Sequence, residues 1–178
     1  MMLWPLLAAA VLLSLERIVY VWAWRFPESF LTVCNQSIIG FHGTPVEVLQ
    51  RFFYGFKVLQ AAVFLGWCHV YGHQSPSLVG TSEGALALAS ILILIGQILN
   101  LSVFYQLGTI GVFYGCKFGY DIPWCREFPF SLFSHPQYVG TLLSIWGFFL
   151  LARFPHGDWY VLPILETVYY VCGAYLEQ

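Results

Sequence analysis

The sequence predicts an all-α, polytopic integral membrane protein with four to five helical segments, the last two of which form a C-terminal helical hairpin. Composition is the first reason: of the 178 residues, 59% are hydrophobic and only 9% are charged, whereas about a quarter of a soluble domain is charged. The apolar residues also gather in runs, and four or five spanning helices of about 20 residues would fill more than half of such a chain. We therefore expect residues 1–178 to form one membrane-embedded domain.

The first apolar segment covers residues 1–24 and carries two charges near its middle, Glu16 and Arg17. It has neither the basic start nor the small-residue cleavage site of a signal peptide, so we expect it to be retained. Charged side chains that face lipid are unfavourable. The segment is therefore either re-entrant or turns Glu16 and Arg17 toward protein or lipid headgroups.

The next segments are judged by length and charge. Residues 25–50 mix prolines and glycines with polar residues, which indicates a connecting region at the membrane interface. Residues 52–71 are a spanning candidate whose one formal charge, Lys57, is expected to snorkel toward the interface. Residues 84–106 are an uninterrupted run of uncharged positions and give the strongest prediction of a spanning helix.

Two shorter apolar runs, residues 138–151 and 159–176, are separated by a polar break that contains proline and glycine. They predict the helical hairpin. Because a hairpin returns the chain to the membrane face it left, Glu177 should lie on the same side as the loop of residues 116–137.

Basic residues predict the orientation, since loops rich in Lys and Arg stay in the cytosol. If the first segment spans the membrane, Arg153 lies alone on one side. The other side then carries Arg25, Arg51, Lys117 and Arg126. The loop of residues 116–137 and the C-terminal end should therefore face the cytosol.

Charge and cysteine content exclude several classes of protein. The net charge is −2 and the basic residues are scattered singly, so nucleic acid is not an expected partner. The five cysteines are widely spaced and include no Cys-x-x-Cys pair, so we expect neither a disulfide framework nor a structural metal site.

Glycines recur beside the central loop, at Gly108, Gly111, Gly115 and Gly119. If one helix continued through them, all four would share a face without side chains. Such a face favours close helix packing. It could also form a smooth wall against a flat ligand.

A series of short motifs at near-fixed spacing resembles the phospholipid N-methyltransferase family, and among its members most closely the plant-type enzymes. The resemblance is strongest between Gly96 and Glu177. The motifs that carry it are Gly96-Gln97-Ile98-Leu99-Asn100, Tyr105-Gln106-Leu107-Gly108, Phe118-Gly119, Ile122-Pro123-Trp124, Glu127-Phe128-Pro129-Phe130 and Pro136-Gln137-Tyr138-Val139-Gly140.

The resemblance implies an enzyme that moves methyl groups from S-adenosyl-L-methionine to the headgroup nitrogen of a phospholipid. The acceptors would be phosphatidyl-N-methylethanolamine and its dimethyl derivative, leading to phosphatidylcholine, with phosphatidylethanolamine as a further candidate. Its partners would be the phospholipid substrate and the bilayer. The family implies a multi-pass protein of the endoplasmic reticulum membrane, with a mitochondrial membrane as the alternative. The chain would then be a single methyltransferase domain.

The family also implies where the methyl donor binds. Binding is attributed there to a Gly-x-Gly motif in the third hydrophobic segment and to an acidic pair that closes the last helix. The first motif falls on Leu94-Ile95-Gly96 and the second on Glu177-Gln178. Only Gly96 and Glu177 match the family residues, so Leu94, Ile95 and Gln178 are assigned by position alone.

Methyl transfer to an ammonium group needs a base, because an alkylammonium has a pKa of about 10 and must lose a proton first. Candidate bases are His135, Glu127 and Asp121. Each has a structural alternative: His135 could be an interfacial histidine bonded to backbone, and Glu127 could form a salt bridge with Arg126 or Lys117.

Aromatic and basic side chains are candidates for holding the phospholipid. Aromatic faces bind methylated ammonium groups, and the candidates include Trp124 and Tyr138, with Tyr105, Tyr114 and Phe130 nearby in the sequence. Lys117 or Arg126 could hold the lipid phosphate.

Two other functions remain open at this level. An isoprenylcysteine carboxyl methyltransferase-like enzyme would share the donor and the hairpin but would methylate a carboxylate. A non-catalytic membrane interaction protein is favoured by the two departures from the family pattern, at Leu94 and Gln178.

Overall fold

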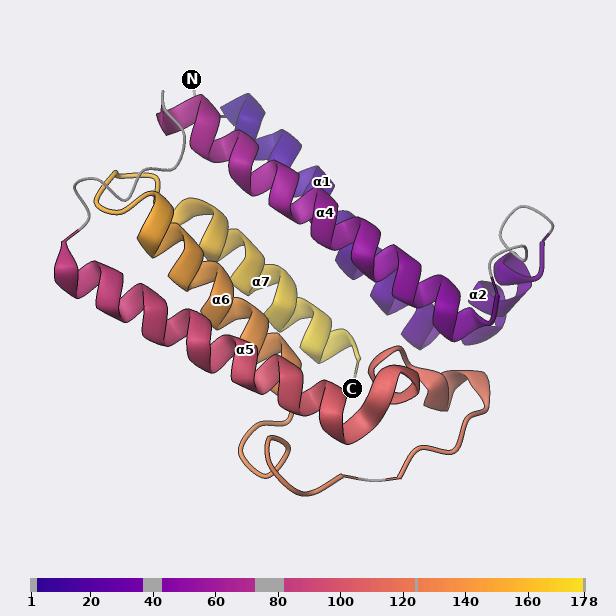
Figure 1. Ribbon diagram of the computed structural model, residues 1–178. Coiled ribbons are helices and arrows are strands. Elements are labelled where there is room, and N and C mark those ends of the chain that lie inside the picture. Colours follow the sequence, from indigo (N-terminus) through magenta and orange to yellow (C-terminus); the bar gives the residue numbers. More distant parts are fainter. Residues whose placement is uncertain (1–2, 37–42, 73–81, 124, 178) are drawn as a thin grey trace.

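The computed structural model describes residues 3–36, 43–72, 82–123 and 125–177, and the regular structure in these ranges is helical (Figure 1). The elements in chain order are α1 (Leu3–Arg25), α2 (Pro27–Cys34), α4 (Pro45–Gly72), α5 (Glu83–Val112), the short 3₁₀ helix η1 (Gly115–Phe118), α6 (Pro136–Ala152) and α7 (Val161–Leu176). Trp124 and Gln178 lie outside the described residues.

Three of the helices, α1, α4 and α5, are long and apolar enough to cross a membrane. The hairpin helices α6 and α7 have 17 and 16 residues, which gives each a length of about 25 Å, slightly less than the roughly 30 Å of a bilayer's hydrocarbon core. The prediction of an all-α, polytopic membrane protein with a C-terminal hairpin is confirmed.

The first helix is continuous, so it is not re-entrant. Its two charged residues, Glu16 and Arg17, are only 5% and 8% exposed and are turned toward the protein. Lys57 was expected to snorkel, but it lies inside α4 and forms an ion pair with Glu16, with 3.0 Å between Nζ and Oε1. A partner on the neighbouring helix therefore replaces the interface as the stabilising environment for this charge.

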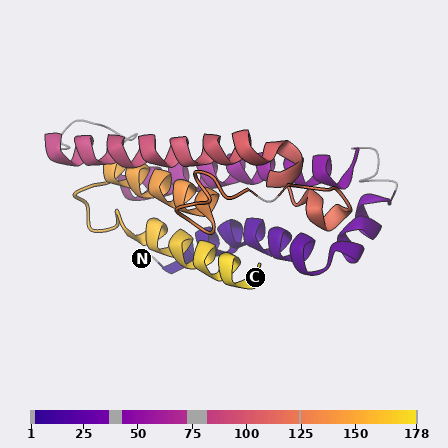
Figure 2. The same ribbon diagram turned by 90° about the horizontal axis from the view of Figure 1, so that it is seen from below.

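The five long helices form one bundle in which α1 packs on α4 and α7, and α6 packs on α5 and α7 (Figures 1 and 2). The tightest approach is between α5 and α6. A Cβ atom on Gly96 would lie 2.4 Å from the carbonyl oxygen of Gly140, and one on Gly140 would lie 2.7 Å from that of Gly96. The small residues of this sequence therefore bring two backbones together, as in other membrane helix pairs.

The region of residues 25–50 is more helical than its composition predicted. It contains α2, which begins at Pro27, and α4 begins at Pro45, seven residues before the predicted start of the spanning segment. A reciprocal cap explains the second start: the Thr44 amide donates to Glu47 Oε2 at 2.7 Å, and the Glu47 amide donates to Thr44 Oγ1 at 3.3 Å.

The four glycines beside the central loop do not share a helical face. Gly108 has a φ of +61° and interrupts the helical geometry of α5, and Gly119 has a φ of +87° directly after η1. Left-handed backbone is inexpensive for glycine and ends helices. The chain therefore turns repeatedly between Gly108 and Gly119 instead of extending α5.

The turn between α6 and α7 is held by a buried ion pair at the opposite end of the bundle from the C-terminus. Arg153 Nη2 lies 2.6 Å from Asp158 Oδ1, and Trp67 Nε1 donates to Asp158 Oδ2 at 2.9 Å. Burial alone would raise the pKa of Asp158, but the hydrogen bonds from Arg153 and Trp67 outweigh it and lower this pKa below its ordinary value.

Candidate functional site

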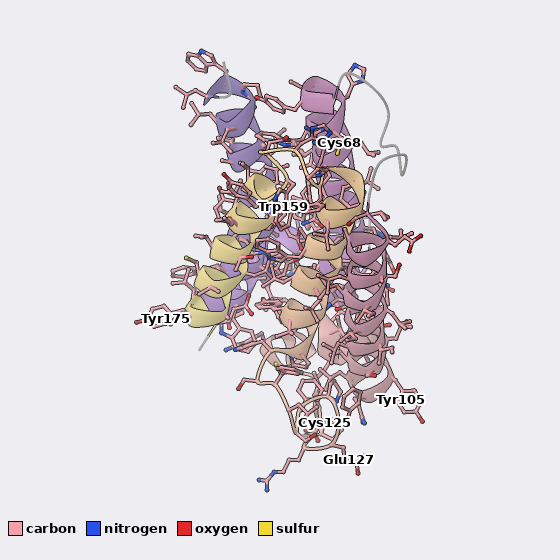
Figure 3. All side chains as sticks on the ribbon, turned by 90° about the vertical axis from the view of Figure 1, so that its left-hand side faces the viewer. Cys68, Tyr105, Cys125, Glu127, Trp159 and Tyr175 are labelled. Atoms are coloured by element: carbon pink, nitrogen blue, oxygen red, sulfur yellow. The ribbon has the colours of Figure 1, made fainter. Side chains whose placement is uncertain are left out.

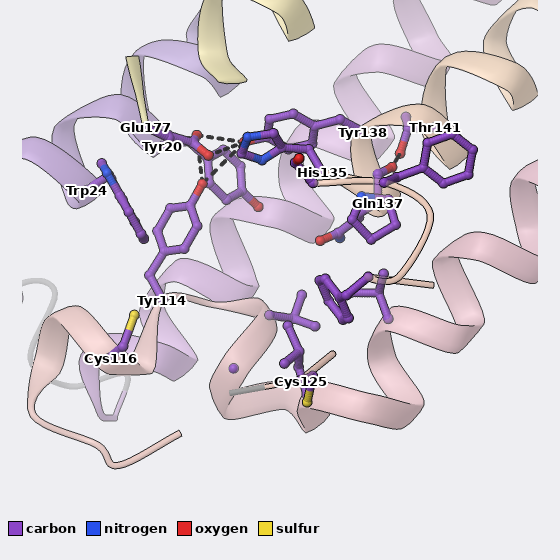
Figure 4. A pocket seen from close by; sticks show the side chains of 18 of the residues that line it. Tyr20, Trp24, Tyr114, Cys116, Cys125, His135, Gln137, Tyr138, Thr141 and Glu177 are labelled. Atoms are coloured by element: carbon purple, nitrogen blue, oxygen red, sulfur yellow. Dashed lines mark hydrogen bonds between the residues drawn. The ribbon is translucent and has the colours of Figure 1, made fainter. Parts of the chain in front are cut away.

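A cavity of about 630 Å³ lies at the end of the bundle where α1 and α7 finish and α6 begins. Its volume falls in the range of small-molecule sites, roughly 300–1,000 Å³. The wall combines residues from α1, α4, α5, the segment between α5 and α6, α6 and α7 with Glu177 directly after it (Figure 4). The polar side chains that matter most for its chemistry are Glu16, Arg17, Lys57, Tyr114, His135, Tyr138, Tyr170 and Glu177.

Glu177 is buried at one side of this cavity, directly after α7. Its carboxylate lies 2.6 Å from the Tyr138 hydroxyl at both oxygens, and the Tyr114 hydroxyl donates to Oε1 at 2.8 Å (Figure 4). His135 lines the same cavity. The prediction that the hairpin brings Glu177 to the side of the central loop is therefore confirmed.

The Glu177 carboxylate has hydroxyl donors but no cationic side chain bonded to it among the described residues. Its residue is only 8% exposed. Removing an ionised carboxylate from water is unfavourable by several kcal/mol, and neutral hydrogen-bond donors recover only part of this free energy. The arrangement therefore favours a cationic group in the cavity beside Glu177.

Tyr114 reaches Glu177 from a strained backbone position. Its φ of 58° places it in the left-handed region, which costs a non-glycine residue about 1–2 kcal/mol. Its ring packs edge-on against Tyr20 and Trp24 of α1, with centroids 5.5 and 5.1 Å away. These contacts hold the hydroxyl in place.

The inner part of the cavity carries the charges of α1 and α4. Arg17 Nη2 donates to Glu16 Oε1 at 2.6 Å, and its guanidinium carbon lies 4.0 Å from the ring centre of Tyr170 and 5.2 Å from that of Tyr138. Lys57 Nζ also donates to the Tyr170 hydroxyl at 3.2 Å.

This inner cluster was not predicted as part of a site. The sequence signal was nevertheless present, because ionisable residues inside a spanning segment mark functional positions by default.

The three candidate bases lie in different surroundings. His135 lines the cavity, and its ring stacks on that of Tyr138, with centroids 5.6 Å apart and an interplanar angle of 16°. Glu127 is exposed and lines a separate hollow with Tyr105 and Gln106. Figure 3 shows Glu127 at the periphery, pointing away from the helices. Asp121 is exposed and does not line the cavity.

The structure places some of the residues predicted to bind the methyl donor at the cavity and others away from it. Glu177 lines the cavity, but Leu94, Ile95 and Gly96 do not. Leu94 and Ile95 are 62% and 44% exposed on α5, and Gly96 faces Gly140 of α6. Gly96 therefore has a packing role in this structure, and Gln178 lies outside the described residues.

Of the residues predicted to bind the phospholipid, some also lie at the cavity and others do not. Tyr138 and Arg126 line the cavity, Arg126 as an exposed residue. The Lys117 ammonium lies 4.0 Å from the ring centre of Trp24 and does not line the cavity. Trp124 lies outside the described residues.

Comparison with known proteins gives a consistent result. A family model described as phospholipid methyltransferase matches residues 85–178. The chain is 33% identical over 139 residues to phosphatidyl-N-methylethanolamine N-methyltransferase of Arabidopsis thaliana, which covers 78% of this chain and 75% of that protein.

Two further relatives match shorter regions. The enzyme of the same name from Saccharomyces cerevisiae is 34% identical over 92 residues, 51% of this chain and 43% of that protein. Phosphatidylethanolamine N-methyltransferase of Rattus norvegicus is 33% identical over 84 residues, 47% of this chain and 41% of that protein. No solved structure matches the chain significantly.

Proposed function

Because the chain belongs to the phospholipid methyltransferase family, we propose that it methylates the headgroup nitrogen of phosphatidyl-N-methylethanolamine and of its dimethyl derivative, forming phosphatidylcholine. The names of the Arabidopsis and yeast relatives support these acceptors. The rat relative is named for phosphatidylethanolamine, which makes the unmethylated lipid a further acceptor to test.

The observation that carries this proposal is the buried Glu177 carboxylate, which two tyrosine hydroxyls hold at the wall of the cavity. We propose S-adenosyl-L-methionine as the methyl donor. Its sulfonium and amino groups are cationic, and they fit a buried carboxylate to which none of the described cationic side chains is bonded. When bound, this donor supplies an electrophilic methyl group. Glu177 would hold it by charge, and Tyr114 and Tyr138 would keep the carboxylate oriented.

His135 is our proposed base. It lines the same cavity as Glu177, and stacking on Tyr138 holds its ring. An imidazole nitrogen would take the proton from the headgroup ammonium, which frees the nitrogen lone pair for attack. Glu127 lies in a separate hollow, so we do not retain it in this role.

The rest of the cavity wall would position the acceptor. The ring of Phe130 offers a face for a methylated nitrogen, whereas His135 and Arg17 already lie against the ring of Tyr138. Arg126 adds positive charge at an exposed position. Holding the nitrogen in line with the methyl group, away from water, accounts for much of the rate enhancement in such displacements.

The chain is a multi-pass membrane protein by its helices and its family. We propose that it resides in the endoplasmic reticulum membrane, with a mitochondrial membrane as the alternative. The cavity lies at the end of the bundle that holds Arg25, Arg126 and the C-terminal helix end. The positive-inside rule therefore favours access from the cytosol, where a soluble donor is available.

The test is an acceptor panel with the purified protein in lipid–detergent micelles. The panel contains phosphatidylethanolamine, its monomethyl and dimethyl derivatives and a prenylated peptide, each with S-adenosyl-L-methionine labelled in the methyl group. We expect label in lipid and none in the peptide. Label in peptide esters alone would identify a carboxyl methyltransferase instead. Failure of the folded protein to bind the donor in calorimetry would indicate a non-catalytic membrane partner.

A further inference from the structure

Arg17 has a buried N–H donor for which the described part of the chain supplies no acceptor. Its residue is 8% exposed, and its Nη1 atom is buried without a hydrogen-bond partner among the described residues. The second terminal nitrogen of the guanidinium, Nη2, donates a hydrogen bond to Glu16. A buried N–H group of a charged side chain that lacks an acceptor destabilises the folded protein. Such a cost is expected where an acceptor arrives with a ligand.

The surroundings of Arg17 carry an excess of positive charge on the cavity wall. Glu16 accepts from both Arg17 and Lys57, so two cations share one carboxylate. The next acidic group, Glu166, does not line the cavity and accepts from the Gln60 amide at 2.6 Å. On the cavity wall around Arg17, an anionic group would therefore meet two cations and one carboxylate.

The two charged ends of the cavity are joined by one side chain. The Tyr138 ring lies 5.2 Å from the Arg17 guanidinium carbon, and its hydroxyl lies 2.6 Å from the Glu177 carboxylate. The wall thus offers a carboxylate near the helix ends and a guanidinium one tyrosine ring away. This order of charges complements an occupant that carries a cation and an anion close together.

We propose that Arg17 binds an anionic oxygen of the substrate through Nη1, and that this oxygen belongs to the phosphodiester of the phospholipid. The inference rests on the proposed function. In the lipid, the phosphate stands between the headgroup nitrogen and the acyl chains. Arg17 lies eight residues before the end of α1, about 12 Å by helical rise. It therefore lies toward the membrane interior, on the side from which the acyl chains extend.

The other cations are weaker candidates for this contact. Arg126 is exposed, and charge pairs in contact with water contribute little. Lys117 lies against Trp24 and outside the cavity wall. Lys57 is already bonded to Glu16, Gln60 and Tyr170. The methyl donor also carries an anionic group, its carboxylate, so a test must distinguish the two sources.

The experiment compares the wild-type protein with Arg17→Met, which leaves Glu16 paired with Lys57, and with Arg17→Gln as a second neutral variant. The matched control is Leu13→Ala, one helical turn away on the same buried face and absent from the cavity wall. The lipid arm measures KM for phosphatidyl-N-methylethanolamine and for its uncharged phosphate methyl ester. The donor arm measures by calorimetry the Kd of S-adenosylhomocysteine and of S-adenosyl-3-thiopropylamine, which lacks only the carboxylate.

We expect the wild type to prefer the charged lipid by about tenfold to a hundredfold, the range for a hydrogen bond to a charged group. Both Arg17 variants should lose this preference and bind S-adenosylhomocysteine as the wild type does, and Leu13→Ala should keep it despite a lower Tm. If the Arg17 variants instead keep the lipid preference and lose a preference for S-adenosylhomocysteine over its decarboxylated analogue, the assignment to the phosphodiester is overturned and the contact belongs to the donor carboxylate.

Three further results would overturn the inference. The first is a wild type without preference in either arm, a result that needs no variant to fold. The second is an Arg17 variant that keeps both preferences. The third is a Leu13→Ala variant that loses the preference for the charged lipid as fully as the Arg17 variants do, which would show a general structural effect. A wild type that methylates no lipid at all would refute the proposed function itself, and the donor arm would still report on Arg17.

Discussion

Replacing Glu177 by Gln should separate donor binding from folding. Gln has nearly the same shape and keeps an oxygen that can accept from Tyr114 and Tyr138, whose hydroxyls lie 2.8 and 2.6 Å from the carboxylate. What disappears is the negative charge. Two unit charges about 4 Å apart attract by about 4 kcal/mol at an effective dielectric constant of about 20. The Gln amide oxygen still attracts the cation as a dipole and retains about half of this attraction, so binding should weaken by about 2 kcal/mol, or about thirtyfold in Kd.

The assay is calorimetric binding of S-adenosyl-L-methionine to the purified variant, with thermal unfolding measured on the same sample. We expect the free energy of unfolding to stay within about 1 kcal/mol of the wild type, since the loss of charge-assisted hydrogen bonds and the relief of a buried charge oppose each other. The control is Glu28→Gln, an exposed residue in the first turn of α2. A folded Glu177→Gln protein that binds the donor within threefold of the wild type would refute the role assigned to this carboxylate.

Two further predictions concern stability. Because the pKa of Asp158 is lowered in the folded protein, the ionised carboxylate stabilises the fold above its ordinary pKa, and this stabilisation is lost as the pH falls through the pKa of the folded state. Thermal unfolding measured at decreasing pH should show the loss, and Asp158→Asn should remove this pH dependence. Gly96→Ala would place a Cβ 2.4 Å from the Gly140 carbonyl oxygen and should destabilise the protein by about 1–3 kcal/mol. The control Gly55→Ala, whose Cβ would have nothing within 4 Å, should stabilise the protein by about 0.5–1 kcal/mol. Equal melting temperatures for these two variants would contradict the α5–α6 packing.

The fold was predictable where the sequence pattern is local and continuous. The uncharged run of residues 84–106 lies inside α5, and the polar break before α7 separates the hairpin helices as expected. The start of α4 was missed because the prediction followed composition alone. The pair Thr44 and Glu47 is a capping signal that the sequence does contain.

The site was only partly predictable because its contacts join distant segments. Chain connectivity alone placed Glu177 beside the loop of His135. No local pattern shows that Arg17 packs on Tyr170, since this contact depends on how α1 and α7 lie in the bundle. Gly96 illustrates the converse problem: a glycine that admits a ligand and a glycine that admits another helix look the same in a sequence.

The ion pair between Glu16 and Lys57 has a consequence for how the chain enters the bilayer. Lys57 lies within the membrane-crossing length of α4 and finds its carboxylate on α1. A lone lysine at the centre of an inserting helix opposes partitioning by about 2.5–3.5 kcal/mol. Packing α4 against α1 supplies Lys57 with the Glu16 carboxylate, so this lysine is less unfavourable in lipid when the two helices are together than when α4 is alone.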